Sequence, residues 1–381
     1  MKVLFVSHYS NLYGANIALL NLIKYLKNNY RIDPFVLITS KGPFTDKLDE
    51  IGVKYYIFKW YYWVHKKGTN FIIWTVKSFL NLIIYRLIFR ELKKENKIFD
   101  IVHSNSSVIN IGAFIAKKFN SKHIWHIREL GGEDFNLYYN RGNKNAGKYY
   151  NKYSSKVIAV SNAVRNKYIN YIDKNKVEVV YDGVAEKLNN IDFTKLYNKE
   201  IINFSFVGII TKNKNQIEAL RAAKILINKY GIKNFKIYFT GGYSDVYYKE
   251  LDNFIKKNNL EENTFFTGYI DKLSNYRKKM DVALVCSKKE AFGLVTVEAM
   301  ISNMPVIGAN TGGTRELIDD DKTGYLYNLG DPEELALKMK KLILNRGLIE
   351  KFGKNGCVKA KKYFTVSINA ENVYKIYKAI I

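Results

Sequence analysis

Short apolar runs alternate along the chain with longer segments in which apolar residues recur every three or four positions. The runs are rich in β-branched and aromatic residues and predict strands, whereas segments such as 15–27 and 108–119 predict amphipathic helices. In the first half of the chain, the predicted strands are 3–6, 34–38, 53–58, 100–103, 123–127, 157–160 and 177–181. This β-α-β-α order predicts a parallel sheet that helices cover on both faces.

A second series of strands with helices between them begins after the polar stretch 182–200. Its predicted strands are 202–207, 235–240, 264–266, 282–286, 306–309 and 325–327, and helices are predicted at 335–344 and 367–381. Two such series predict an α/β chain with two Rossmann-like domains, 1–190 and 191–366, and we expect helix 367–381 to pack back on the first domain. Ligands of open α/β sheets bind beyond the carboxyl ends of the strands, so the cleft between the domains is the expected site.

The chain is strongly basic, with 61 Lys and Arg against 35 Asp and Glu among 381 residues and a formal net charge of +26. Such a surplus favours polyanionic partners, or else it is ordinary solvated surface. Nucleic acid is not expected, because the basic residues are dispersed and no nucleic-acid fold signature occurs. Two cysteines, Cys286 and Cys357, exclude a disulfide scaffold and fit a reducing cytoplasm. The amino terminus lacks a signal-peptide core, so we do not expect export.

The segment 52–97 combines ten lysines and arginines with only two glutamates, and it holds three of the four tryptophans, Trp60, Trp63 and Trp74. Residues 71–90 are long enough to span a bilayer, yet Lys77 and Arg86 would each cost about 2.5–3.5 kcal/mol at mid-membrane. We therefore expect the segment to lie on an anionic membrane surface, with the rings of Trp60 and Trp63 inserted. The alternative is an ordinary domain helix preceded by an aromatic, acceptor-binding loop.

Several sequence matches to known functional motifs are not expected to be functional in this chain. Residues 142–148 have the spacing of a phosphate-binding P-loop, but Tyr149 replaces the metal-binding Ser or Thr and no strand leads into it. The acidic run 319–321 precedes a turn and is expected to be solvated surface. No dinucleotide fingerprint, nucleophile elbow or zinc-protease motif occurs, and we expect no metal site.

The informative stretch is 287–300, which follows the predicted strand 282–286 and opens a helix near Gly293. Backbone amides at Phe292, Gly293 and Leu294 would form an anion site suited to a nucleotide diphosphate. Glu298, more than one turn into the helix, could accept hydrogen bonds from ribose hydroxyls. Glu290, in the loop, could reach a sugar ring beyond the phosphates.

With these motifs, the chain resembles the retaining GT-B glycosyltransferases that carry the E-x7-E motif, known as glycosyltransferase family 4. The resemblance extends over nearly the whole chain. In the second half it rests on 266–269, 281–287, 305–307, 311–316 and 323–325, and in the first half on 13–15, 126–129 and 160–162. Two positions depart from the family pattern: Ile209 replaces the usual Arg, and Asp182 replaces a common Asn.

The resemblance implies a role for each of these positions. The second domain would hold the donor, with Tyr269 near the base, Glu298 on the ribose, and Gly208 and Lys214 on the diphosphate. Lys212 is a possible substitute for the missing Arg. Glu290 and His126 are the expected catalytic residues, since both would contact the donor sugar. His123, within its strand, is expected to be a satisfied buried imidazole. The residues expected to line the acceptor side of the cleft are Gly14, His103, Arg128, Glu129 and Ser161.

The expected function is retaining, metal-independent sugar transfer from a nucleoside-diphosphate-sugar, with UDP favoured and GDP-mannose possible. The donor is a substrate, so no cofactor is expected. The basic, aromatic first domain suits a lipid-linked or oligosaccharide acceptor in capsule or O-antigen assembly, with the protein peripheral on the inner face of the membrane. Two alternatives remain open: a sugar-nucleotide epimerase on the same fold, and a non-enzymatic polyanion-binding protein.

Overall fold

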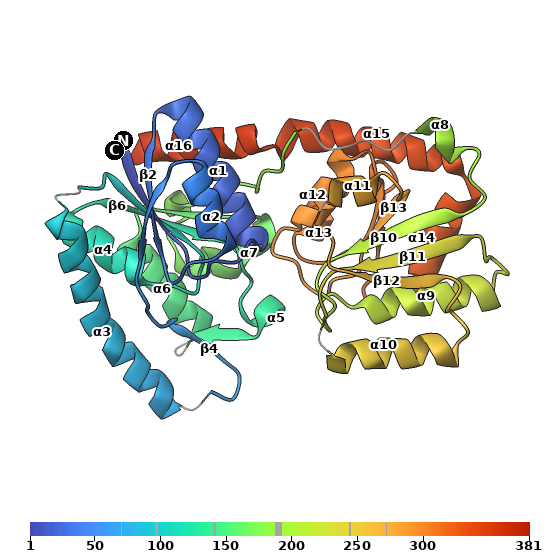
Figure 1. Cartoon of the computed structure of the whole chain (residues 1–381), viewed down its shortest axis with the longest axis horizontal. Helices are drawn as coiled ribbons and strands as arrows, with labels where there is room; N and C mark the ends of the chain where they lie inside the picture. Colours follow the sequence, from blue (N-terminus) through green and yellow to red (C-terminus); the bar gives the residue numbers. More distant parts are fainter. Residues whose placement is uncertain (70, 96–97, 140–141, 187–192, 244, 272) are drawn as a thin grey trace. The chain divides into compact units, whose positions relative to one another are not determined.

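The structure is a computed structural model, and it describes the chain except for residues 70, 96–97, 140–141, 187–192, 244 and 272. The described residues form two compact units (Figure 1). The N-terminal unit comprises residues 1–183 and 366–381, and the C-terminal unit comprises residues 184–365. The domain boundary predicted at 190/191 lies outside the described residues.

The N-terminal unit is built on a seven-stranded sheet with the order β3-β2-β1-β5-β6-β8-β9, in which every neighbouring pair is parallel. The strands are β1 Lys2–Val6, β2 Asp33–Ile38, β3 Lys54–Ile57, β5 Ile101–Asn105, β6 Lys122–Ile127, β8 Lys156–Ala159 and β9 Val177–Val179. All seven apolar runs of this half therefore form strands, as predicted. The central strand β1 is buried from Val3 to Val6, as expected for a parallel strand covered on both faces.

Helices of the N-terminal unit connect these strands and cover the sheet (Figure 1). They are α1 Gly14–Tyr30, α2 Pro43–Glu50, α3 Phe71–Lys94, α4 Ile111–Phe119, α5 Gly132–Phe135, α6 Gly142–Tyr153, α7 Asn162–Tyr168 and α16 Val366–Ile380, with 3₁₀ turns at Ile169–Tyr171 and Lys174–Lys176. The P-loop-like residues 142–148 lie within α6, so no strand-to-helix phosphate loop forms there.

A small antiparallel pair of strands, β4 Val64–Lys66 and β7 Leu137–Tyr139, was not predicted from the sequence. Each strand has three residues, which is too short to show a period of two. The pairing of Val64 with Tyr139 also joins segments that are remote in the sequence. No local signal could have found this sheet.

The C-terminal unit contains a six-stranded parallel sheet with the order β12-β11-β10-β13-β14-β15. The strands are β10 Ile202–Val207, β11 Phe235–Thr240, β12 Thr264–Gly268, β13 Val282–Val285, β14 Val306–Ala309 and β15 Gly324–Tyr327. The helices are α8 Phe193–Leu196, α9 Gln216–Asn228, α10 Asp245–Lys257, α11 Leu273–Arg277, α12 Leu294–Ile301, α13 Thr314–Leu317, α14 Pro332–Leu344 and α15 Arg346–Tyr363. The second series of strands is thus confirmed.

Helix α16 belongs to the core of the N-terminal unit although it is the last element of the chain. Its buried residues Ala370, Val373 and Ile376 share one apolar cluster with α1 and β1. Tyr374 also stacks on Tyr30 at the end of α1, with ring centroids 4.2 Å apart. The sequence expectation for this helix therefore matches the packing of residues 366–380.

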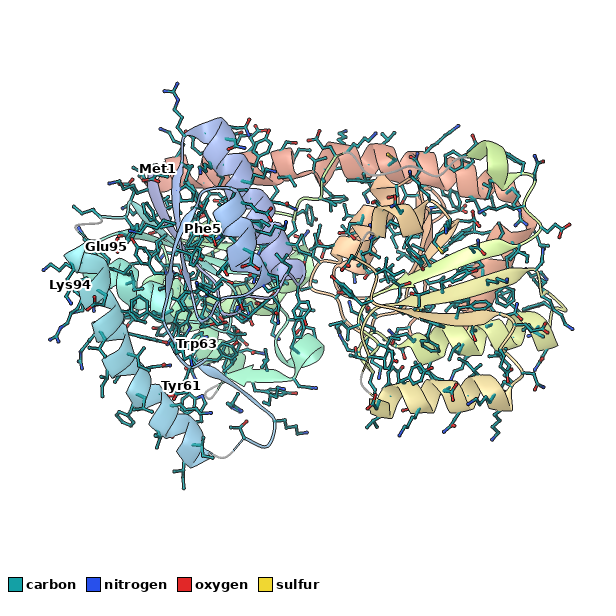
Figure 2. The ribbon with its side chains drawn as sticks, viewed as in Figure 1. Met1, Phe5, Tyr61, Trp63, Lys94 and Glu95 are labelled. Carbon is teal, nitrogen blue, oxygen red and sulfur yellow. The ribbon has the colours of Figure 1, made fainter. Side chains whose placement is uncertain are left out.

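Helix α3 differs from the other helices because much of its apolar surface is exposed (Figure 2). One stripe, Asn81, Tyr85, Ile88 and Leu92, is buried against the unit. The opposite stripe, at the spacing i, i+4, i+7, i+11 and i+15, is exposed, and it consists of Ile72, Val76, Phe79, Ile83 and Leu87. By length and composition, residues 72–94 form one helix that could cross a membrane.

The tryptophans before α3 contradict the expectation that Trp60 and Trp63 insert into lipid. Trp60 is 6% exposed. Trp63 lies within the unit, 5.6 Å from the Trp125 ring and 4.9 Å from the Tyr149 ring, and its Nε1 donates a hydrogen bond to the Ser107 carbonyl (Figure 2). The Trp60 ring is thus buried, and the partly exposed Trp63 ring packs against other aromatic rings directly before β4. The aromatic composition alone could not distinguish these two fates.

Candidate active site

The loops at the carboxyl edge of the C-terminal sheet approach one another closely because glycines occupy the contact points. Gly208, directly after β10, has φ of +147°, and a Cβ on Gly241, after β11, would lie 2.2 Å from the Gly208 carbonyl oxygen. A side chain on Gly241 would collide with the backbone of Gly208, so glycine is required for the loops after β10 and β11 to be in contact. The loop that carries Lys214 is thereby held close to the sheet.

A second pair of glycines fixes the loop that carries Glu290. Cβ atoms on Gly312 and Gly313 would lie 2.4 Å from the Glu290 carbonyl oxygen and 2.7 Å from the Ala291 carbonyl oxygen. The amide of Gly313 also donates a 2.8 Å hydrogen bond to the Glu290 carbonyl. The glycines of the motif 311–316 therefore lock the backbone of the loop between β13 and α12.

Glu290 and Lys214, two of the predicted donor ligands, are brought together. The Lys214 ammonium forms an ion pair with Glu290 Oε1, which also accepts a 2.7 Å hydrogen bond from the Ser287 hydroxyl. Both side chains are partly exposed, at 25% for Lys214 and 14% for Glu290. A cation and a carboxylate thus lie together where strands β10 and β13 end.

Glu298, on α12, forms an ion pair with Arg277, which closes α11. The Arg277 side chain is 4% exposed and that of Glu298 is 22% exposed. The arginine therefore anchors one carboxylate oxygen while the carboxylate remains partly accessible. Sequence reasoning missed Arg277, because a single basic residue in a five-residue helix carries no local signal of its partner.

The remaining donor candidates have different environments. Gly293, with φ of +108°, is the N-cap of α12, and Leu294 is the first residue of this helix, whose positive dipole end favours anions. Phe292 is buried and its ring contacts that of Phe364. Tyr269 is 78% exposed after β12, and Lys212 forms its ion pair with Glu250 on α10, not with Glu290. Lys212 as a substitute for the missing Arg stays a prediction.

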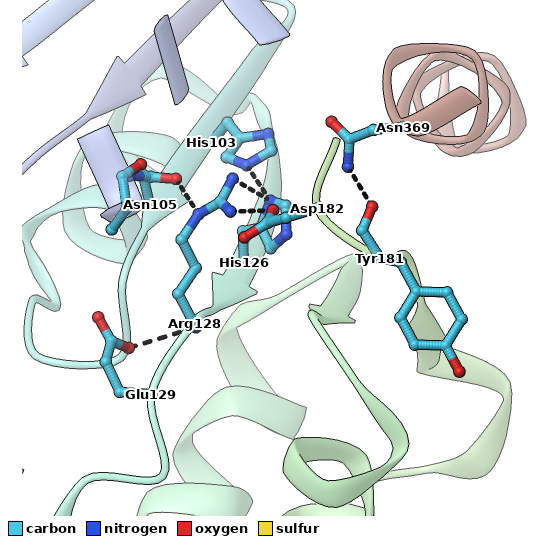
Figure 3. A network of polar contacts seen from close by, with 9 residues as sticks. His103, Asn105, His126, Arg128, Glu129, Tyr181, Asp182 and Asn369 are labelled. Atoms are coloured by element: carbon cyan, nitrogen blue, oxygen red, sulfur yellow. Dashed lines mark hydrogen bonds and ion pairs between the residues drawn. The ribbon is translucent and has the colours of Figure 1, made fainter. Parts of the chain in front are cut away.

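In the N-terminal unit, buried polar side chains gather where β5 and β6 end (Figure 3). The guanidinium of Arg128 donates from Nε to Asn105 Oδ1 at 2.6 Å and from Nη1 to Asp182, with which it forms an ion pair. Its Nη2 contacts His126 Nδ1 at 3.4 Å. Asp182, where the family commonly has Asn, thus supplies the counter-charge for a buried arginine in this chain.

His126 and His103 contact each other within this network, with His103 Nε2 3.2 Å from His126 Nδ1. His103 Nδ1 lies 2.7 Å from the hydroxyl of Tyr377 on α16. Burial, and after it the charge of Arg128, holds the pKa of both imidazoles well below the usual value. Both histidines are therefore neutral at physiological pH.

The other predicted residues of this unit have local structural contacts. Glu129 accepts hydrogen bonds from the Ser106 hydroxyl at 2.5 Å and the Ser107 amide at 2.9 Å, and so fixes the loop after β5. Ser161 is the N-cap of α7, where its hydroxyl accepts from the Val164 amide, and Gly14 is the first residue of α1.

His123 is a satisfied buried imidazole, as predicted, with contacts to the Ser104 hydroxyl and the Tyr153 carbonyl. Among the described residues, no group of three or more His, Cys, Asp or Glu side chains could hold a metal ion.

Comparison with known proteins decides the family. Residues 13–187 match the model described as Glycosyltransferase Family 4, and residues 189–358 match the model described as Glycosyl transferases group 1. An uncharacterised glycosyltransferase of Methanocaldococcus jannaschii is 31% identical over 277 residues, which cover 71% of this chain and 72% of that protein. The chain belongs to glycosyltransferase family 4.

Further relatives of this family 4 protein agree in sequence and in fold. The capsular polysaccharide biosynthesis glycosyltransferase CapM of Staphylococcus aureus is 26% identical over 59% of this chain and 62% of its own length. The crystal structure of Anabaena HepE in complex with UDP superposes with a TM-score of 0.83 at 20% identity over the whole of both chains. The two units are therefore the two Rossmann-like domains of the GT-B fold, as the sequence predicted.

Proposed function

We propose that this family 4 glycosyltransferase moves a sugar from a UDP-sugar to a lipid-linked or oligosaccharide acceptor in surface polysaccharide assembly. The observation that carries the proposal is the grouping of Lys214, Glu290 and the start of α12 at one edge of the C-terminal sheet. The choice of donor is supported by the UDP and UDP-glucose complexes of HepE. The pathway is supported by CapM and by a poly(ribitol-phosphate) α-N-acetylglucosaminyltransferase of Staphylococcus aureus, 25% identical over 91% of this chain and 72% of that protein.

The mechanism that we propose rests on electrostatic stabilisation of the departing diphosphate. Bond cleavage at the anomeric carbon leaves negative charge on the phosphate, and the Lys214 ammonium with the dipole end of α12 would stabilise it. Glu290 would hold hydroxyls of the donor sugar, and Glu298 would hold those of the ribose. We propose retention of the anomeric configuration, as in the family that the chain resembles, and positive charge from side chains and amides in place of a metal.

We further propose that helix α3 docks this enzyme on an anionic membrane. Its exposed apolar stripe, from Ile72 to Leu87, is available for lipid, whereas the Trp60 ring is buried and the Trp63 ring packs against that of Trp125. Basic residues follow toward the carboxyl end of the helix, where Arg86, Arg90 and Lys94 share the exposed side. An oblique position fits this order, with the amino-terminal end of α3 inserted and the basic end among anionic headgroups.

A lipid-linked acceptor is consistent with that position, because a membrane-bound enzyme meets such an acceptor in two dimensions. Crossing the bilayer is less favourable, since Lys77 and Arg86 would enter the hydrocarbon. We therefore propose a peripheral, cytoplasmic enzyme on the inner face of the membrane.

The proposed function is tested by incubating the full chain with a panel of nucleotide-sugars. Thermal shift should select UDP-sugars, because a ligand that binds only the folded protein at a hundred times its Kd stabilises it by about 2.7 kcal/mol. Transfer of radiolabelled sugar to a polyprenyl-linked acceptor should follow. Release of an epimerised sugar-nucleotide without any acceptor would favour the epimerase instead, and stabilisation by unrelated polyanions alone would favour the binding protein.

A further inference from the structure

The contacts around His126 determine which of its nitrogens carries the proton. A guanidinium has hydrogen-bond donors and no acceptor, so the nitrogen that faces Arg128 Nη2 must be unprotonated. That nitrogen is His126 Nδ1, at 3.4 Å (Figure 3). A neutral imidazole with a bare Nδ1 carries its proton on Nε2. His126 is therefore in the Nε2–H form.

The same contact sets the direction of the hydrogen bonds behind His126. Because His126 Nδ1 accepts, His103 Nε2 at 3.2 Å must be the donor, and the neutral His103 then has a bare Nδ1. The Tyr377 hydroxyl at 2.7 Å consequently donates to His103 Nδ1. In this series, Tyr377 therefore donates a hydrogen bond to His103, and His103 donates one to His126.

The last donor of the series, His126 Nε2–H, is buried and has no hydrogen-bond partner among the described residues. A buried donor without a partner costs free energy, which an oxygen acceptor placed beside it would recover. An Nε2–H can donate to a hydroxyl or ring oxygen, but it cannot accept a proton from one. The chemistry of the site thus favours a role for His126 in binding over one as a general base.

We propose that Arg128 is a positioning residue that fixes His126 as a neutral Nε2–H donor for an oxygen atom of the bound sugar. Asp182 and Asn105 hold the guanidinium in place from two further sides, through Nη1 and Nε. The tautomer is a property of the free protein, and only the sugar as recipient of the hydrogen bond rests on the proposed function.

His123 provides an internal control with the opposite tautomer. Its Nδ1 lies 2.7 Å from the Tyr153 carbonyl oxygen, which only accepts, so Nδ1 must carry the proton. Its Nε2 then accepts from the Ser104 hydroxyl at 2.9 Å. One molecule therefore contains three buried histidines, of which His103 and His126 should show the Nε2–H form and His123 the Nδ1–H form.

The test is ¹⁵N NMR of the full chain labelled only at histidine, since the chain has five histidines and each can be assigned by a single His→Gln variant. In the unliganded protein, His126 should give a pyridine-type signal for Nδ1 and a pyrrole-type signal for Nε2, and His123 should give the reverse. A pyrrole-type Nδ1 signal from His126 would overturn the proposal.

Two variants then separate a positioning role from a structural one. Arg128→Lys keeps a cation beside Asp182 but is too short to reach His126, so the Nδ1 signal should move toward the pyrrole type. Tyr377→Phe removes the hydroxyl that donates to His103 but keeps Arg128, so His126 should stay in the Nε2–H form. If Arg128→Lys does not fold, the Arg128→Met/Asp182→Leu double variant removes both buried charges together and should show the same move. A folded variant without the Arg128 guanidinium whose His126 signals are unchanged would show that this residue does not set the tautomer.

Activity provides the second readout. Arg128→Lys should lower kcat for sugar transfer by about tenfold, the equivalent of one hydrogen bond, and leave the Kd for UDP unchanged. If the wild-type protein shows the expected tautomers and transfers no sugar, the proposed function fails and the positioning of His126 stands. Full transfer activity in a variant with the altered tautomer would refute the role of His126 as a donor to the sugar.

Discussion

Lys214 and Glu290 form an ion pair although they lie in loops that follow two different strands of the C-terminal sheet, β10 and β13. Each is a predicted ligand of a different part of the donor, the diphosphate and the sugar. A diphosphate that bound Lys214 would therefore have to compete with Glu290 for the ammonium. If the two residues bind the donor as proposed, Lys214 would exchange its contact with Glu290 for one with the diphosphate, and the Glu290 carboxylate would become available to the sugar in the same step.

Replacing Glu290 should separate catalysis from nucleotide binding. Glu290→Gln should lower turnover by about a hundredfold or more, because the carboxylate is assigned to the sugar. The affinity for UDP should stay the same or rise, since Lys214 loses its competing partner. Steady-state kinetics and calorimetric titration with UDP measure the two effects. Glu333→Gln, in an exposed ion pair with Lys229, is the control, and wild-type turnover in Glu290→Gln would exclude the assigned role.

Replacing Glu298 should weaken nucleotide binding and also destabilise the C-terminal unit. Glu298→Ala removes a hydrogen-bonding carboxylate, which should cost about 1–3 kcal/mol of nucleotide affinity. It also leaves the buried Arg277 without its partner. The double variant Arg277→Met/Glu298→Leu should regain stability without regaining affinity, as measured by thermal unfolding and calorimetry. Unchanged UDP affinity in Glu298→Ala would remove this residue from the donor site.

The stability of the N-terminal unit should fall as the pH is lowered below about 6.5. Burial lowers the pKa of His123 to about 4, with the Tyr153 carbonyl opposing the shift, so between pH 6.5 and 4 only the unfolded chain binds a proton there. The contribution of His123 to the free energy of unfolding is fully present above pH 6.5. Between pH 6.5 and 4 it falls by about 1.4 kcal/mol for each pH unit of acidification. Asp134, whose pKa is raised to about 7 by burial, acts with the opposite sign.

A variant isolates the contribution of His123 from these other groups. His123→Gln should change the free energy of unfolding by the same amount at every pH above 6.5. Between pH 6.5 and 4, the free energy of unfolding of the variant should depend less on pH than that of the wild type. Urea unfolding followed by tryptophan fluorescence is suitable, because Trp60, Trp63, Trp74 and Trp125 all lie in the N-terminal unit. Parallel stability curves for His123→Gln and the wild type would contradict the expectation.

Membrane binding should depend on two separate features, the basic residues in and before α3 and the exposed apolar stripe of α3. The protein should co-sediment with anionic vesicles and be released as salt rises, because exposed charges are screened within about 8–10 Å. Changing Lys66, Lys67, Lys93 and Lys94 to Gln should weaken binding by about 1 kcal/mol for each charge near the surface. Changing Ile72, Phe79 and Ile83 to Ser should remove the salt-resistant part.

Trp63→Phe is the matched control for this experiment. Because Trp63 is packed among aromatic rings, the variant should lose stability through the Ser107 hydrogen bond and bind vesicles normally. Equal sedimentation with neutral and anionic vesicles, or with neither, would mean that the basic surplus is compositional and that the exposed stripe has another partner.

The sequence predicted the strands and the loop between β13 and α12 because these depend on local order. A buried parallel strand is a continuous apolar run, and the helix after β13 begins at a glycine, so Glu290 and Glu298 could be located from spacing alone. Partners that approach from remote segments left no such signal. Arg277 beside Glu298, and Tyr377 beside His103, are examples.

The tryptophans show a further limit of composition. Trp60 and Trp63 lie next to basic residues in the sequence, which favours a membrane interface, yet Trp60 is buried and Trp63 packs against the ring of Trp125. For α3, the sequence left a membrane-surface helix and an ordinary domain helix as alternatives, and the structure shows that the apolar stripe from Ile72 to Leu87 is exposed.

The position of α16 also orders events during synthesis. This helix fills part of the core against α1, and its Tyr377 completes the polar network at His103, yet 182 residues of the C-terminal unit, 184–365, precede it. On the ribosome, the second unit has all of its residues before the first one does. The apolar core of the N-terminal unit is therefore incomplete until residues 366–380 emerge from the ribosome. A stalled or prematurely ended chain would therefore leave the first-made half of the protein exposed to proteases while the later-made half is already folded.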